Sequence, residues 1–377
     1  MKLINIITDR KFEDWVSYQL LYEWEDALSE DLNIPVVDND RKPINIKNRI
    51  FFYIREKIKY PIIKMFRNMN IKQEPSSFSL YFQLHVSGYV HIPKAKMNRI
   101  VPVIVDAFID EGYYPEFIRK FKDCPLILIS SIEAYNFLKS KNCPLNIKYW
   151  GLSISDKYRF KPSQIYKKNF DILLIGRQNP VLKNFLETYI SNNPDRKIEI
   201  LKGDYVNNEF VNISNIQGRL GSLGQRESYM DLLKQSRIAL YGTPGIDGGE
   251  KRTRGYNPVT PKYLELLASQ CKMLAKYPDT VETRLYEMDK VCPSLDTYED
   301  FEAKLTEYLD DKPVDIKLYS SILDKHYTSV RAEELLHILE EFNLIREYNE
   351  IKHRNTARRW HRSGNYRTSV ESYGRSL

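Results

Sequence analysis

The feature that most constrains this chain is a repeated alternation of short apolar runs with segments whose apolar residues recur at helical spacing. A short apolar run bounded by polar residues is typical of a buried strand, and a longer periodic segment is typical of an amphipathic helix. Alternating strands and helices predict a parallel sheet covered by helices on both faces. In the first half, the predicted strands are 3–7, 34–37, 78–84, 100–105 and 125–130, and the predicted helices are 12–28 and 131–139.

The alternation stops at a polar, irregular stretch, 153–168, and then starts again. The predicted strands of the second half are 170–175, 197–201, 238–241 and 272–275, and the predicted helices are 181–191, 227–235 and 261–269. A connection rich in glycine and asparagine is expected to run to Gly224. We therefore predict two doubly wound, Rossmann-like α/β domains, residues 1–155 and 165–325, facing across a cleft. Such sheets bind ligands at the carboxyl ends of their strands, which makes this cleft the predicted site.

The C-terminal part of the chain divides into a helix and a basic tail. Apolar residues at helical spacing predict a helix within 330–350, which is expected to return to the first domain. The tail, 352–377, carries +6 of the net charge of +7, so the rest of the chain is close to neutral. A neutral body argues against a nucleic-acid partner. The basic and aromatic tail suits an anionic membrane surface, with nucleic-acid binding or a solubilising tail as the alternatives.

Several further patterns bear on location and metals. A second basic segment, 49–69, predicts either a solvated helix face or a membrane-surface patch. The chain has no apolar run long enough to span a bilayer, and its N-terminus turns polar too early for a secretory signal. The four cysteines form no C-x-x-C pair, so neither a zinc site nor a disulfide framework is predicted. Asp38 and Asp40 have a spacing that can hold a divalent metal, but we interpret them as a polar turn. We expect a cytoplasmic protein without a metal site, attached peripherally to the membrane if the tail binds there.

The segment 241–268 predicts a helix start that binds an anion. Thr260 fits the N-cap position and Pro261 the first helical position, where its missing N–H costs nothing. The free N–H groups and the helix dipole at that end suit a diphosphate. Lys262 lies in the first turn, where a cation is disfavoured unless a phosphate is bound nearby. Glu265 follows about one turn further on and is placed to accept hydrogen bonds from sugar hydroxyls. A surface carboxylate on an ordinary capped helix is the alternative.

A second group of candidate donor-binding residues follows the strand at 170–175. Gly176 permits the close approach of a backbone, and Arg177 presents a guanidinium group suited to phosphate oxygens. Lys183 lies at the start of the next predicted helix. An arginine that caps the edge of a sheet is the alternative for Arg177.

These two groups of residues resemble the C-terminal, donor-binding half of GT-B glycosyltransferases. The resemblance is to the retaining family with a Glu-x7-Glu motif and to its spore-maturation-type relatives, and it covers residues 169–310. It rests on Ile175-Gly176-Arg177 with Lys183, on the helix–strand unit 229–241, and on Thr-Pro-Lys-Tyr-Leu-Glu-Leu-Leu-Ala at 260–268.

The resemblance implies a metal-independent glycosyltransferase whose substrate is a nucleotide-diphosphate sugar and which needs no other cofactor. Arg177 and Lys183 would neutralise the donor diphosphate, and the backbone of 260–262 would cradle it. Glu265 would hold the nucleotide ribose. Cations and amides aimed at the leaving phosphate would lower the barrier to sugar transfer. A glycan or lipid-linked acceptor is also implied, in the assembly of a bacterial surface polysaccharide or glycoconjugate.

The sequence departs from the family pattern at two positions. Asn257 stands eight positions before Glu265, where the family has its first glutamate, and Gln270 stands where the family has a glycine. Asp247 or Glu250 can supply the missing acid, or else both are turn-forming loop residues. The departure leaves open a second function, a non-catalytic nucleotide- or glycan-binding protein with the same fold.

An acceptor base is expected from the first domain. His85 follows the strand predicted at 78–84, and Asp106 follows the strand predicted at 100–105. Both positions open toward the predicted cleft. Either residue can act as the catalytic base, or be an ordinary loop residue.

Overall fold

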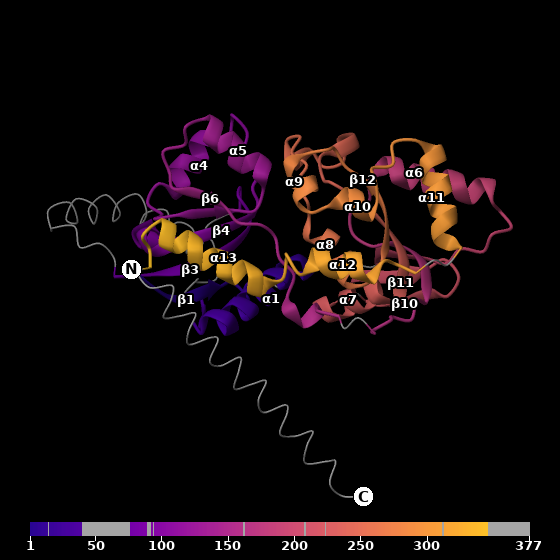
Figure 1. Cartoon of the computed structure of the whole chain (residues 1–377), viewed down its shortest axis with the longest axis horizontal. Helices are drawn as coiled ribbons and strands as arrows, with labels where there is room; N and C mark the ends of the chain where they lie inside the picture. Colours follow the sequence, from indigo (N-terminus) through magenta and orange to yellow (C-terminus); the bar gives the residue numbers. More distant parts are fainter. Residues whose placement is uncertain are drawn as a thin grey trace, which may run out of the picture.

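The computed structural model describes residues 1–13, 15–39, 76–88, 92, 94–160, 163–206, 209–222, 224–310 and 313–345. These residues form two α/β domains that lie side by side, the first at the left of Figure 1 and the second at the right. The segment 49–69, Asp40 and the tail 352–377 lie outside the described residues, so the predictions made for them stay predictions. Among the helices described, none is both long enough and apolar enough to cross a membrane.

The first domain is built on a parallel sheet with the strand order β2-β1-β3-β4-β5-β6. The strands are β1 (Lys2–Thr8), β2 (Val36–Asp38), β3 (Ser77–His85), β4 (Ile100–Asp106), β5 (Ile127–Ile129) and β6 (Ile147–Tyr149). The helices are α1 (Val16–Leu32), α4 (Tyr114–Phe121) and α5 (Ile132–Ser140). The central strands β3 and β4 are buried along almost their whole length because both faces of the sheet are covered.

The second domain is built on a sheet with the strand order β10-β9-β8-β7-β11-β12. The strands are β7 (Phe170–Leu174), β8 (Ile200–Val206), β9 (Glu209–Ser214), β10 (Gly218–Ser222), β11 (Ser236–Gly242) and β12 (Lys272–Lys276). The helices are α6 (Pro180–Asn192), α7 (Arg226–Gln235), α8 (Pro261–Ala268), α9 (Val281–Leu285), α10 (Met288–Val291), α11 (Tyr298–Leu309) and α12 (Ile316–Leu323). Strands β8, β7, β11 and β12 are parallel. The predicted fold class of two doubly wound, Rossmann-like domains is therefore confirmed.

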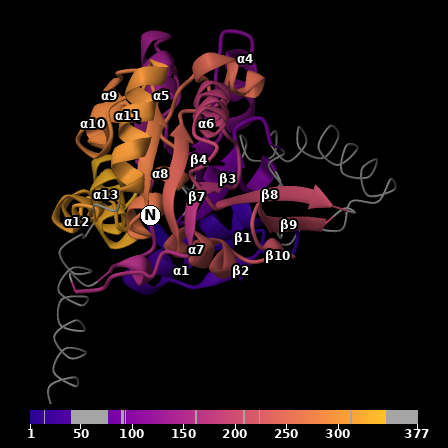
Figure 2. The same cartoon turned by 90° about the vertical axis from the view of Figure 1, so that its right-hand side faces the viewer.

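Two strands occupy the connection that the sequence predicts as irregular up to Gly224. β9 pairs antiparallel with β8, and β10 pairs antiparallel with β9, which extends the sheet at one edge (Figure 2). β10 contains two glycines and a single apolar residue, Leu220. A strand of that composition shows no alternation of apolar and polar residues, so the sequence pattern could not reveal it.

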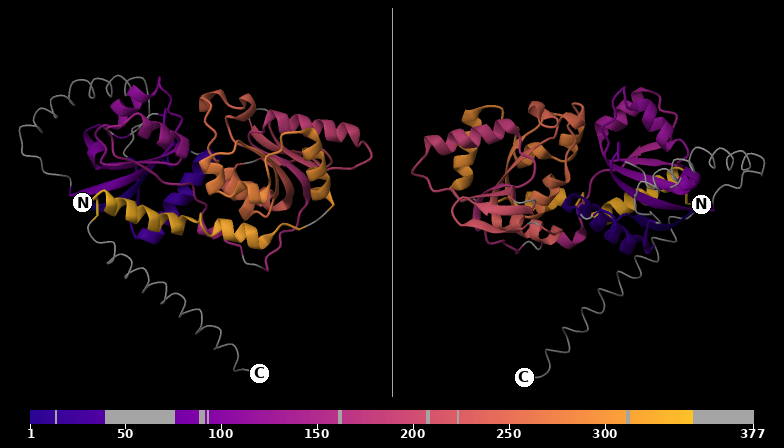
Figure 3. Two further views of the ribbon diagram at one scale, coloured as in Figure 1. Left: turned by 45° about the horizontal axis from the view of Figure 1, so that its top comes forward. Right: turned by 180° about the vertical axis from the view of Figure 1, so that it is seen from behind.

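The chain returns to the first domain through α13 (Thr328–Glu341), which packs against α1 (Figures 1 and 3). The indole N–H of Trp150 donates to the backbone oxygen of Arg331 at 3.1 Å. Ile154 and Tyr327 form an isolated parallel bridge just before this helix. α13 overlaps the predicted closing helix, 330–350, but begins at Thr328 and ends at Glu341; residues 346–350 lie outside the described part.

Buried charges join the two domains at their seam, the surface along which the domains meet. Arg226, at the start of α7, pairs through Nε with Glu23 on α1 at 3.1 Å and through Nη1 with Glu265 on α8 at 2.6 Å. Burial lowers the pKa of Arg226, but the two carboxylates outweigh burial and raise it. The hydroxyl of Tyr158 donates to Glu23 at 2.5 Å, and that of Tyr229 donates to Glu265 at 2.9 Å. This network fixes α1 against α7 and α8.

Replacing Arg226 with alanine should destabilise the protein by ~3–5 kcal/mol, because two buried carboxylates would lose their cation. The matched control is Arg219→Ala, which removes an exposed ion pair with Glu209 in the same domain and should cost less than ~1 kcal/mol. Urea unfolding of both variants and the wild type measures the difference. Equal losses in the two variants would contradict a role for the buried network.

Candidate functional site

His85 and Asp106 form a pair at the carboxyl ends of β3 and β4. The two residues are register partners in the parallel sheet, and His85 Nδ1 lies 2.9 Å from Asp106 Oδ2. A carboxylate at Nδ1 holds the proton on that nitrogen and leaves Nε2 as a hydrogen-bond acceptor. Nε2 lies 3.2 Å from Nη1 of Arg252, which comes from the second domain. The structure thus brings together two residues that the sequence offered as separate candidates, and it places them at the seam.

The part of the second domain that faces His85 and Asp106 is the loop between β11 and α8, residues 243–260. Arg252 reaches His85, and Arg254 forms an ion pair with Asp110 of the first domain. The hydroxyl of Tyr256 donates to the backbone oxygen of Ile109 at 2.6 Å. Gly245 allows the loop to fold tightly, since a Cβ there would lie 2.4 Å from the backbone oxygen of Tyr256. The loop therefore lies against the residues that follow β3 and β4.

Arg177 enters the same region from the end of β7. It follows Gly176, whose φ of +76° is the left-handed conformation that glycine adopts most readily. Burial lowers the pKa of the Arg177 guanidinium. Arg177 pairs with one oxygen of Glu250, and Arg252 pairs with the other. A series of alternating charges thus runs from β7 of the second domain, through the loop, to His85 in the first domain.

Lys183 lies apart from this group. Its side chain is exposed on α6 and forms an ion pair with Glu187 at 3.7 Å. Within the described residues, no contact joins Lys183 to Arg177 or Glu250. A role for Lys183 at the donor diphosphate stays a prediction.

The residues at the start of α8 occupy the predicted positions, but their side chains make other contacts than those predicted. Thr260 occupies the N-cap position and Pro261 the first helical position, but the Thr260 side chain makes no capping hydrogen bond. Its N–H and hydroxyl instead donate to the Tyr241 hydroxyl, at 3.0 and 3.3 Å. Lys262 turns inward, and its Nζ donates to the backbone oxygens of Ile175 at 3.1 Å and Leu240 at 3.2 Å. Burial lowers the pKa of Lys262 to about 8. This ammonium lies just beneath the strand ends that carry Arg177.

Glu265 belongs to the buried seam network rather than to the group around Arg177. One oxygen accepts from Arg226 and the other from Tyr229, and the side chain is 6% exposed. To hold a ribose, Glu265 would have to exchange one of these partners. The ribose contact stays a prediction, whereas the contacts of Glu265 with Arg226 and Tyr229 are present in the structure.

The two loop acids and Asn257 have separate environments. Asp247 accepts a hydrogen bond from Asn179 Nδ2 at 2.9 Å and has a left-handed φ of 55°, whereas Glu250 holds the two arginines. The Asn257 side-chain oxygen accepts from Thr243 Oγ1 at 3.0 Å. Over the described part of the chain, no cluster of histidine, cysteine and acidic side chains could hold a metal ion.

Hydrogen bonds from backbone N–H groups to acidic side chains also join the two domains. Glu282 on α9 accepts from Ile132 N, at the start of α5, at 2.8 Å and from Val259 N at 3.0 Å. Burial raises the pKa of Glu282 to about 8, against the opposing effect of these two hydrogen bonds. Glu133 on α5 accepts from Asn257 N at 2.6 Å. These contacts fix the C-terminal end of the β11–α8 loop against the first domain, directly through Glu133 and indirectly through Glu282.

Sequence reasoning missed Arg252, Glu133 and Glu282. A signal existed for Arg252, because three basic residues, Lys251, Arg252 and Arg254, stand close together in the glycine-rich loop before Thr260. No comparable signal marked Glu133 or Glu282, since each acts on backbone N–H groups that are distant in sequence.

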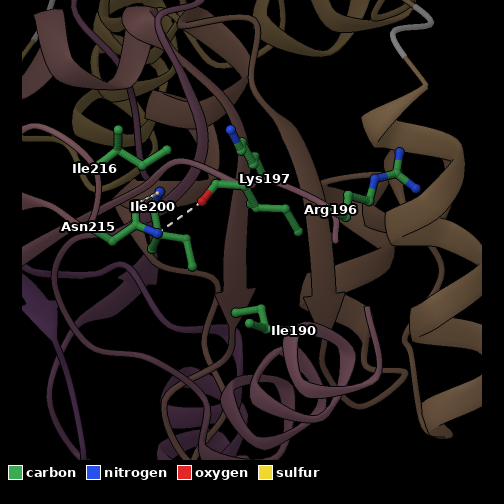
Figure 4. Close-up of a pocket in the computed structure, with 7 residues that line it drawn as sticks. Ile190, Arg196, Lys197, Ile200, Asn215 and Ile216 are labelled. Carbon is green, nitrogen blue, oxygen red and sulfur yellow. Dashed lines mark hydrogen bonds between the residues drawn. The ribbon is translucent and has the colours of Figure 1, made fainter. Parts of the chain in front are cut away.

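A cavity of about 420 Å³ lies elsewhere in the second domain, at the amino end of β8 (Figure 4). Its walls are Ile190, Arg196, Lys197, Ile198, Ile200, Asn215 and Ile216. The candidate site lies at the opposite, carboxyl edge of the same sheet. The cavity is therefore separate from the residues discussed above.

No family model matches this chain, and no curated protein matches it either. Among solved structures, the chain is similar to the GtfA/B complex, with 8% identity and a TM-score of 0.45. That likeness covers 75% of this chain and 60% of the other, so this chain spans less than two thirds of that structure.

Two other solved structures are similar over most of their length. UDP-GlcNAc 2-epimerase from Methanocaldococcus jannaschii has 14% identity over 90% of this chain and 100% of its own, with a TM-score of 0.45. Spinosyn rhamnosyltransferase SpnG, complexed with thymidine diphosphate, has 9% identity over 90% of this chain and 100% of its own, with a TM-score of 0.33. Because every TM-score is low, we assign no function from these likenesses. The structure itself shows two Rossmann-like domains and a last helix, α13, that returns to the first of them.

Lys262, which turns inward and is partly buried, should give the stability of the protein a measurable pH dependence. The ordinary pKa of lysine is 10.5, and burial lowers that of Lys262 to about 8, so between these values the unfolded state binds more protons. This lysine therefore makes the free energy of unfolding rise with pH over that window. The variant Lys262→Met should lack this contribution, so wild type should gain stability relative to the variant between pH 8 and pH 10.

Urea unfolding at both pH values measures this difference. Lys317→Met, which removes an exposed lysine from α12, is the control. A stability difference between wild type and Lys262→Met that stays constant with pH would show that folding does not lower the pKa of Lys262.

Proposed function

We propose that this protein is a glycosyltransferase that moves a sugar from a nucleoside-diphosphate donor to a hydroxyl acceptor. One observation carries the proposal. Arg177 and Arg252, two cations suited to phosphate, converge at the seam with the His85–Asp106 pair, which is suited to accept a proton. The four side chains come from four segments and from both domains, at the carboxyl ends of both sheets.

The proposed chemistry follows from these groups. The acceptor oxygen forms a bond to the anomeric carbon of the donor, and the bond from that carbon to the diphosphate oxygen breaks. The proton of the acceptor hydroxyl goes to His85 Nε2, and Asp106 stabilises the resulting imidazolium. The electron pair of the broken bond goes to the diphosphate, where the two guanidinium groups offset the growing negative charge.

The wider setting of the reaction is part of the proposal. The acceptor is a glycan or a lipid-linked glycan, in assembly of a bacterial surface polysaccharide or glycoconjugate. The basic tail 352–377 brings the enzyme to an anionic membrane surface. No metal or further cofactor takes part, because the arginines supply the positive charge at the leaving group.

A non-catalytic nucleotide- or glycan-binding protein is the second candidate. Asn257 favours it, since an amide stands at the family's first glutamate and is engaged with Thr243. Slow hydrolysis of a bound nucleotide sugar separates the two functions, because water can replace the acceptor in an active transferase. A binding protein should leave the donor intact.

Two substitutions should separate donor binding from chemistry. Arg177→Ala should weaken the binding of a nucleoside diphosphate by about tenfold or more, because a charge-assisted contact is lost. His85→Ala should not weaken that affinity, because it removes only a contact that competes for Arg252, and it should slow donor hydrolysis by ~10²–10⁴-fold, because the base is lost. Calorimetry with UDP, GDP and TDP measures the first effect, and release of free sugar measures the second.

Wild type should be stabilised against heat by at least one of these nucleotides. If none of them binds, the proposed function loses its main support. If His85→Ala hydrolyses the donor at the wild-type rate, the role assigned to the base is wrong even where the nucleotide binds.

A further inference from the structure

The carboxylate of Glu250 occupies a position built for a larger anion. Each of its oxygens forms an ion pair with a guanidinium group, one from Arg177 and one from Arg252. The arginines come from separate segments, the end of β7 and the β11–α8 loop. Guanidinium groups present the same fork of N–H donors to a carboxylate and to a phosphate. A pair of them that converges on one acid therefore also matches the oxygens of a diphosphate.

The main chain of Glu250 is anchored independently of its side chain. Its N–H donates to the backbone oxygen of Pro244 at 2.9 Å, and its backbone oxygen accepts from Thr253 Oγ1 at 2.7 Å. The carboxylate can therefore leave the arginines by rotation of the side chain while the loop keeps its path. The Glu250 side chain is 23% exposed, so solvent can take up the displaced carboxylate.

We propose that Glu250 marks the diphosphate subsite, and that the donor diphosphate displaces its carboxylate from Arg177 and Arg252. This inference rests on the proposed function and assigns the anion that the two arginines bind. It also changes the role of Glu250, which the sequence offered as a catalytic acid. Glu250 is here a competitor for the subsite, and it keeps two cations paired at the seam.

The subsite also links the donor to the base. Arg252 touches Nε2 of His85, the atom that accepts the proton. A diphosphate that binds the Arg252 guanidinium weakens this contact and leaves Nε2 to the acceptor hydroxyl. The leaving group and the base therefore share one arginine, Arg252.

The test is the sign of an affinity change. Glu250→Gln keeps the size of the side chain and removes its charge, so it should bind inorganic pyrophosphate and UDP or GDP about tenfold more tightly, equivalent to about 1.4 kcal/mol. Pyrophosphate is included because it has no nucleobase, so its binding reports on the diphosphate subsite alone. Glu209→Gln removes the same charge from an exposed position in the same domain and should leave both affinities unchanged. Calorimetry measures all of them.

A catalytic or structural role for Glu250 gives a different result. If Glu250→Gln binds the diphosphates as weakly as wild type, or more weakly, the inference is overturned. The gain should also vanish in the background of Arg177→Ala, because half of the subsite is then missing. Should Glu250→Gln not fold, Glu250→Asp is the second variant. Its shorter side chain cannot form ion pairs with both arginines, so it should also bind the diphosphates more tightly than wild type does.

Failure of this inference is distinguishable from failure of the proposed function. If wild type binds UDP or GDP and Arg177→Ala weakens that binding, the donor site stands whatever the result for Glu250. If wild type binds neither the nucleotides nor pyrophosphate, the proposed function fails together with the subsite.

Discussion

Each domain presents polar groups at the seam that the other domain satisfies. The N–H of Ile132 belongs to the first turn of α5, where it has no partner within its own helix, and Glu282 of the second domain accepts it. Arg226 likewise has one of its two carboxylates on each domain. A buried polar group left without a partner costs ~1–3 kcal/mol, so these contacts favour one relative orientation of the domains. The candidate site depends on that orientation, because its residues come from both sides.

The register of β3 and β4 determines the other half of the site. His85 and Asp106 meet because they are paired positions at the ends of neighbouring parallel strands. A shift of one residue in either strand would turn one side chain to the opposite face of the sheet. The register runs from the pair Ser79–Ile100 to the pair His85–Asp106, which is the last pair of the ladder. The strand pairing that builds the sheet therefore also sets the orientation of the proposed base.

The sequence predicted most of the strands and the fold class because buried parallel strands are apolar along their whole length. It also placed His85 and Asp106 at strand ends, but their pairing needed the register of two strands. Glu265 was harder, because its partners Arg226 and Tyr229 lie on another helix, α7. β10 gave no apolar pattern at all. What the sequence could not reveal was in each case set by contacts between distant segments.

The loop between β11 and α8 carries more of the site than the start of α8 does. The resemblance drew attention to Thr260, Lys262 and Glu265, yet Lys262 binds backbone oxygens and Glu265 holds the seam. The loop instead supplies Glu250 and Arg252, which contact Arg177 and His85. The Lys262 side chain is held by two backbone oxygens, whereas loop side chains can exchange one ionic partner for another. In the proposed function, the charge that responds to the substrate therefore lies in the loop, and α8 supports the loop from behind.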